Sequence, residues 1–230
     1  MELPDLKDHP TLIVSNLQIT GPKAPATTGT IQVQSRVVST TSDRTYTEGI
    51  AQCQNAVVAA TAAVGGLQGK TQKIEVAAGG AANCYWLPWG SGKIFMGQLA
   101  NDHEYFFTYT INGCGFIIGG TPAQPLVAHA NLESDRLTQA VTDAMRLGPR
   151  AGATAAKEQA LIYEQFYGNL AAKLIEMNQM SGARLEVVTP QQYLIDAGAG
   201  FGAVFGINKD KRGAWEFYGN WANQTKKIWP

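Results

Sequence analysis

The stretch that decides the fold runs Phe106-Phe-Thr-Tyr-Thr-Ile-Asn-Gly-Cys114-Gly-Phe-Ile-Ile-Gly-Gly-Thr-Pro-Ala-Gln-Pro-Leu-Val-Ala-His129. Its aromatic and β-branched residues are typical of β-strands. An aromatic strand precedes a short apolar strand that begins at Cys114, and Gly119-Gly120-Thr121-Pro122 supplies a turn. Leu126–Ala130 can return as the antiparallel partner, so this part of the chain predicts a β-hairpin.

The flanking sequence predicts strands in the first half of the chain and near its C-terminal end, with helices between them. Further strands are expected at residues 11–20, 30–40, 70–77, 184–189, 202–208 and 215–219, whereas 48–64 fits either a helix or a strand. One helix is expected from Ser134 or Asp135 to about Leu147, where Gly148-Pro149 ends it, and a longer one from Ala155 to about Met180. The prediction is one mixed α/β or α+β domain over residues 1–230.

Composition excludes several classes of function. The 230 residues hold 18 Lys+Arg against 18 Asp+Glu, so no basic surplus favours binding to nucleic acid. The N-terminal segment lacks the apolar core of a signal peptide, and no apolar run is long enough to span a bilayer. Three cysteines, with no CxxC pair, predict reduced thiols and neither a metal site nor a disulfide framework. We therefore expect a soluble protein without a cofactor.

Cys114 and His129 are the candidate catalytic pair because the predicted hairpin can place them opposite each other. If Ile118 pairs with Pro125 around a loop at 119–124, the two side chains share a face, with Cβ atoms about 4.5–5.5 Å apart. An imidazole there can take the thiol proton and hold a thiolate–imidazolium pair. Such a thiolate can attack an amide carbonyl, and the imidazole can then protonate the departing amine.

Neighbouring residues offer the other parts that such a site needs. Backbone N–H groups around Gly113 and Gly115 are candidates for stabilising the oxyanion of the intermediate. A third side chain should orient the imidazole, and Thr108 and Asn131 are the local candidates.

A structural interpretation of the same residues stays open. A cysteine in an aromatic, apolar strand is most often a small buried apolar residue, and a lone histidine such as His129 is usually satisfied by local hydrogen bonds. Cys53 and Cys84 have no histidine nearby in the sequence and are expected to be structural.

Three sequence blocks occur in order before the strand Pro125–His129: Trp86-Leu-Pro-Trp89, Phe106-Phe-Thr-Tyr and Ile111-Asn-Gly-Cys114. This combination resembles the toxin-type glutamine deamidases, the family of Burkholderia lethal factor and the catalytic domain of the cytotoxic necrotizing factors. The similarity is clearest over residues 84–131. The family carries a Leu-x-Gly-Cys motif, and this chain has isoleucine in place of the leucine.

The resemblance implies roles for individual residues: Cys114 as nucleophile, His129 as general base and acid, and Thr108 as the supporting residue. It also implies a β-sandwich-like core of mixed strands surrounded by helices. The first hypothesis for function is accordingly a toxin or effector that deamidates a glutamine in a host protein. The sequence does not indicate the route by which it reaches that protein. A transglutaminase, a thiol protease and a non-catalytic binding module that keeps the fold are the alternatives. The substrate protein and the oligomeric state do not follow from the sequence.

Overall fold

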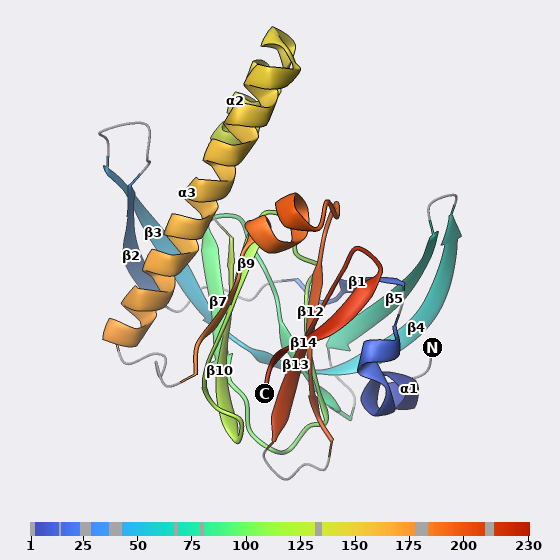
Figure 1. Ribbon diagram of the computed structural model, residues 1–230. Helices are drawn as coiled ribbons and strands as arrows, with labels where there is room; N and C mark the ends of the chain where they lie inside the picture. The colour runs from blue at the N-terminus through green and yellow to red at the C-terminus, as the bar shows by residue number, and fades with distance from the viewer. Residues whose placement is uncertain are drawn as a thin grey trace.

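The computed structural model describes residues 3–13, 15–23, 29–36, 43–66, 69–78, 81–131, 135–177, 184–209 and 214–230. Two mixed β-sheets pack face to face in it, with helices on the outside (Figure 1). The structure is mostly β, and the α+β fold predicted from the sequence is confirmed.

The larger sheet consists of β1 (Asn16–Thr20), β4 (Gln54–Gly66), β5 (Gly69–Ala78), β6 (Cys84–Leu87), β8 (Tyr105–Thr108), β12 (Ala203–Asn208), β13 (Trp215–Trp221) and β14 (Gln224–Trp229). Their order is β1-β5-β4-β6-β8-β12-β13-β14. The sheet curls strongly, since the Leu17 N–H on β1 donates to Asn220 Oδ1 on β13 at 2.7 Å although these strands stand far apart in that order.

The smaller sheet consists of β2 (Gly29–Arg36), β3 (Asp43–Gln52), β7 (Lys93–Gln98), β9 (Cys114–Thr121), β10 (Gln124–Asn131) and β11 (Glu186–Val188). Their order is β11-β9-β10-β7-β3-β2. The segment 48–64, which the sequence left open, is extended and contributes to β3 and β4.

Strand β9 lies between two apolar layers. Its alternate residues Cys114, Phe116 and Ile118 enter the core between the sheets, where the Phe116 ring lies 5.7 Å from that of Phe106. Ile117 points the opposite way, into the layer under a long helix. Because both faces are covered, the strand reads as a continuous apolar run rather than as an alternating one.

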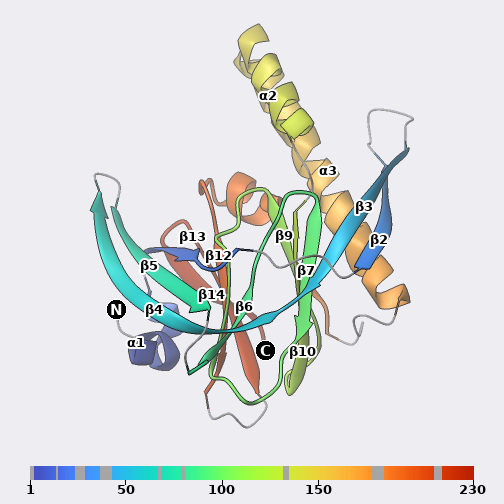
Figure 2. The same cartoon turned by 180° about the vertical axis from the view of Figure 1, so that it is seen from behind.

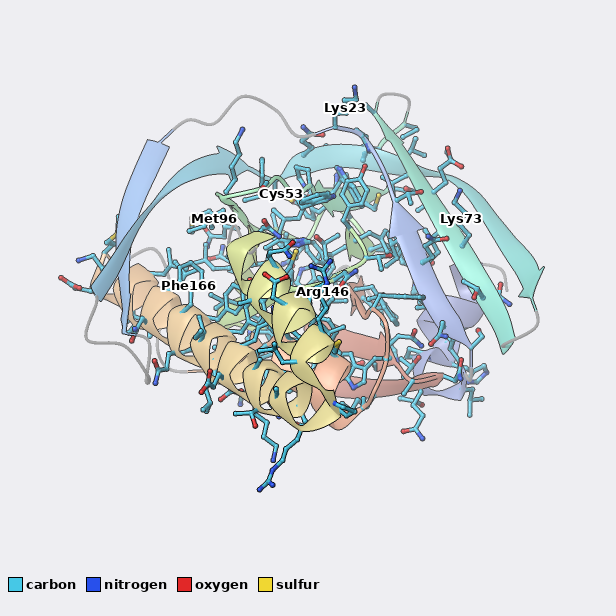
Figure 3. All side chains as sticks on the ribbon, turned by 90° about the horizontal axis from the view of Figure 1, so that it is seen from above. Lys23, Cys53, Lys73, Met96, Arg146 and Phe166 are labelled. Atoms are coloured by element: carbon cyan, nitrogen blue, oxygen red, sulfur yellow. The ribbon has the colours of Figure 1, made fainter. Side chains whose placement is uncertain are left out.

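That helix, α3 (Pro149–Glu176), covers the outer face of the smaller sheet (Figure 2). Phe166 on α3 and Met96 on β7 belong to the apolar cluster between the helix and the sheet. Both are labelled in Figure 3. Helix α2 (Asp135–Leu147) runs back along the N-terminal half of α3, and both extend beyond the sheet (Figure 1).

The predicted bounds hold for α2 but not for α3, which begins at Pro149 rather than near Ala155. Proline is tolerated in the first turn of a helix because its missing N–H has no partner there, so Gly148-Pro149 ends one helix and begins the next. Leu161 of this helix is 49% exposed, although it is apolar.

Three short elements complete the structure: α1 (Leu3–Asp8), η1 (Pro10–Leu12) and a π-helix, η2 (Gln191–Asp196). Leu6 of α1 joins an apolar cluster on the far side of the larger sheet. Within the described residues, no helix is both long and apolar enough to cross a membrane.

Candidate active site

The β9–β10 hairpin carries the candidate catalytic pair in a register two residues away from the predicted one. Around a two-residue turn at Pro122-Ala123, Cys114 lies opposite Asn131 and His129 lies opposite Phe116. The predicted direct pairing of Cys114 with His129 is therefore wrong.

Glycines explain the shift, because Gly119 and Gly120 continue the strand instead of forming the turn. Gly120 has φ of +88°, and a Cβ on it would lie 2.9 Å from the Gln124 carbonyl oxygen, so no larger residue fits there. A shift of two residues leaves every side chain on its face. Cys114 and His129 thus remain on one face as diagonal neighbours, a relation in which residues are about 7–8 Å apart.

Thr108 contacts the imidazole, as the sequence predicted. Its Oγ1 lies 2.6 Å from His129 Nδ1 and donates its single proton to the Leu87 carbonyl at 2.7 Å. Because that proton is engaged, Oγ1 must accept from Nδ1–H, which fixes the tautomer of the imidazole with Nε2 unprotonated. Leu87 belongs to the Trp86–Trp89 block, so this block contributes a carbonyl to the site.

His129 is wholly enclosed, at 1% exposure. Desolvation by burial lowers the pKa of its imidazole to about 3. Nε2 has no hydrogen-bond partner within the part of the chain that the structure describes. At rest the imidazole is therefore neutral, and its Nε2 lone pair makes no hydrogen bond to a described group.

Cys114 is the first residue of β9, and its thiol contacts Asn131 across the hairpin. The Asn131 amide donates to Sγ at 3.1 Å, so this side chain binds the thiol and does not orient the imidazole as the sequence suggested. Burial raises the pKa of the Cys114 thiol, although the Asn131 amide and a backbone hydrogen bond from Asn112 pull it down. The resting pair is thus a thiol and a neutral imidazole rather than the expected thiolate–imidazolium pair, because burial disfavours both charges.

The two positions beside Cys114 require glycine for different structural reasons. Gly113 has φ of +80°, which glycine adopts without strain. Gly115 lies under the ring of Tyr167, where a Cβ would approach a ring carbon to 2.4 Å. Whether their backbone N–H groups bind an oxyanion stays a prediction.

Two tyrosines that the sequence reasoning missed also reach this segment. The Tyr167 hydroxyl on α3 donates to the Gly113 carbonyl at 2.9 Å, and the Tyr193 hydroxyl on η2 donates to the Cys114 carbonyl at 2.8 Å. Both residues are fully buried. They lie 54 and 79 positions from their acceptors, so no local pattern could have indicated them.

A cleft of about 480 Å³ opens beside Gly113, between the hairpin and the helices. The described residues of its lining offer amide, hydroxyl and apolar groups: Asn112, Gly113, Val141, Thr142, Met145, Gln159, Tyr163 and Leu194. Among these described residues, the groups suit an uncharged ligand better than an ion.

The remaining thiols lie outside this arrangement. Cys53 Sγ donates to the Trp86 carbonyl at 3.2 Å, and Cys84 Sγ donates to the Ala56 carbonyl at 3.3 Å. Burial raises the pKa of the Cys84 thiol to about 12 and that of Cys53 even further. Both therefore act as small apolar residues, as the sequence indicated. Among the residues described, no three His, Cys, Asp or Glu side chains gather as metal ligands would.

No protein-family model matches the chain, and no curated protein matches its sequence.

Proposed function

We propose that this protein is a glutamine deamidase that converts the side-chain carboxamide of a glutamine in a host protein to a carboxylate. The observation that carries the proposal is the buried contact of 2.6 Å between Thr108 Oγ1 and His129 Nδ1. It leaves Nε2 as the basic nitrogen, on the strand next to the one that begins with Cys114. The resemblance of residues 84–131 to toxin-type deamidases supports the same assignment.

The proposed reaction has two halves. As Cys114 Sγ attacks the carboxamide carbon, its proton passes to His129 Nε2, which requires Sγ to leave Asn131 and turn toward the imidazole. Backbone N–H groups around Gly113 and Gly115 would hold the negative oxygen of the tetrahedral intermediate.

The imidazolium then gives its proton to the departing nitrogen, so that ammonia leaves and a thioester remains. In the second half, His129 takes a proton from water as the water oxygen attacks the thioester. That proton returns to Sγ, and the glutamate side chain is released.

Burial favours a side-chain amide over a peptide bond as the substrate. Cys114 is 4% exposed and His129 1% exposed, so a group that reacts with them has to stand at the end of a thin side chain. A glutamine carboxamide stands at the end of two methylenes, whereas a peptide bond has chain on both sides. The same enclosure favours water over a larger amine in the second half, which supports deamidation over transglutamination. We expect the reaction to occur in a host cytosol, where thiols stay reduced.

The test compares proteins of a host-cell lysate, freed of ammonia, after exposure to the wild-type protein, to Cys114→Ser and to Cys84→Ser. We expect the wild type and Cys84→Ser to release ammonia and to raise the mass of individual glutamine peptides by the glutamine-to-glutamate difference. Cys114→Ser should do neither. Full activity of Cys114→Ser would refute the proposal, and cleaved backbones in place of mass-shifted peptides would point to proteolysis.

A further inference from the structure

The two buried tyrosines bind consecutive carbonyls on either side of the Cys114 α-carbon. Tyr167 reaches the Gly113 oxygen from α3, and Tyr193 reaches the Cys114 oxygen from η2. A π-helix is an uncommon element that recurs at functional sites, and η2 also places Leu194 in the lining of the cleft.

Each of these hydrogen bonds fixes a whole peptide group, since the group is planar and trans. Tyr167 fixes the plane before the Cys114 α-carbon, and Tyr193 fixes the plane after it. Two fixed planes determine φ and ψ of Cys114 and hence the direction of its Cα–Cβ bond. The amide N–H groups of Cys114 and Gly115, which belong to the same planes, are held with it.

The flanking glycines match this arrangement. Gly115 has no side chain where the Tyr167 ring lies, and Gly113 takes the positive φ that turns its carbonyl to the Tyr167 hydroxyl. Burial raises the pKa of the Tyr193 phenol well above its usual range, so the hydroxyl stays a donor throughout the physiological pH range.

We propose that Tyr167 and Tyr193 are positioning residues, which hold the backbone around Cys114 so that its thiol and adjoining amides meet the substrate carboxamide. This proposal rests on the proposed function, because it assigns the two phenols a role in the attack by Cys114. A role confined to stability would predict that Tyr→Phe variants lose only stability.

The test uses Tyr193→Phe and Tyr167→Phe, with Tyr218→Phe as the matched control. Tyr218 is also buried, at 3% exposure, but its hydroxyl donates to Glu216 on the larger sheet. The substrate is the lysate protein that the wild type deamidates. We expect each positioning variant to lower kcat between about tenfold and 100-fold with little change in KM, since a lost hydrogen bond also misplaces the reacting groups.

Alkylation of Cys114 by iodoacetamide provides the contrasting measurement. It needs a thiolate but no oxyanion, so its rate should change less than about twofold in the same variants. Amide hydrogen exchange, followed by NMR, should be about tenfold faster at Cys114 and Gly115 in Tyr193→Phe and unchanged in Tyr218→Phe.

The possible failures are distinguishable. A wild type that converts no glutamine refutes the proposed function, and the positioning role with it. An active wild type whose Tyr193→Phe and Tyr167→Phe variants keep kcat refutes the positioning role alone. Unchanged amide exchange at Cys114 and Gly115 in the Tyr193→Phe variant would also refute the positioning role, whatever the activity.

Discussion

Acidification should destabilise the folded protein because His129 is buried in its neutral form. Its pKa is about 3 in the folded state, against about 6.5 for an exposed histidine. Below pH 6.5 the unfolded chain binds a proton at this position, whereas the folded protein does not. The contribution of the neutral imidazole is fully present above that pH and is lost as the pH falls from 6.5 towards 3.

The size of the effect follows from the two pKa values. At pH 5 nearly all unfolded chains carry the proton and almost no folded molecules do, which costs about 2 kcal/mol of folding free energy relative to pH 7.5. The group is fully enclosed, so solvent screening does not reduce this figure. Glu216, whose pKa is lowered by Lys227 and Tyr218, loses its own contribution only at more acidic pH.

Urea unfolding of the wild type and of His129→Asn at pH 7.5, 6.5, 5.5 and 5 measures the effect. Asparagine can donate to Thr108 as Nδ1–H does but does not titrate, so the difference between the two curves isolates His129. We expect the wild type to lose about 2 kcal/mol more than the variant between pH 7.5 and 5. Parallel curves would refute the claim that the folded protein buries a neutral imidazole.

Three further predictions concern the neighbours of the pair. Thr108→Val should lower kcat about 100-fold, because His129 then loses the oxygen that holds its proton on Nδ1. Thr108→Ser keeps this oxygen and should keep most of the rate. Gly115→Ala should lower the free energy of unfolding by about 1–3 kcal/mol, because its Cβ meets a tyrosine ring at 2.4 Å. In the same denaturant titration Gly168→Ala, whose Cβ meets no atom within 4 Å, should raise it by about 0.5–1 kcal/mol. Asn131→Ala should slow iodoacetamide alkylation of Cys114 at pH 8 about tenfold, and an unchanged rate would contradict the Asn131 contact.

The hairpin shows which part of a strand pairing a sequence can specify. The predicted hairpin places the Cys114 and His129 side chains on one face, and this holds in the observed register, where His129 lies opposite Phe116, two residues from Cys114. The register depends on where the turn begins, and Gly119-Gly120 fits a loop as well as a strand in the absence of its partner. The space around Gly120, closed by the Gln124 carbonyl, decides between them.

The surroundings of Cys114 could not be predicted, because they come from distant parts of the chain. Thr108 and Asn131 lie close in sequence and were found, although Asn131 binds the thiol instead of the imidazole. Tyr167 and Tyr193 reach the site only after the long helix and the π-helix have packed on the hairpin. The Gly-Cys-Gly sequence was the available signal: glycines on both sides of a thiol indicate close approach of other groups.

Burial of both reacting groups determines how the proposed chemistry has to begin. A thiolate and an imidazolium in this enclosure would each lose solvation, and the raised pKa of Cys114 with the lowered pKa of His129 disfavours the pair at rest. Charge separation then becomes favourable only when the negative charge passes from sulfur to the carboxamide oxygen. There, backbone N–H groups can stabilise the charge by hydrogen bonding. The thiol should therefore transfer its proton during the attack on bound substrate rather than before it, and groups that place the backbone amides matter as much as groups that ionise the sulfur.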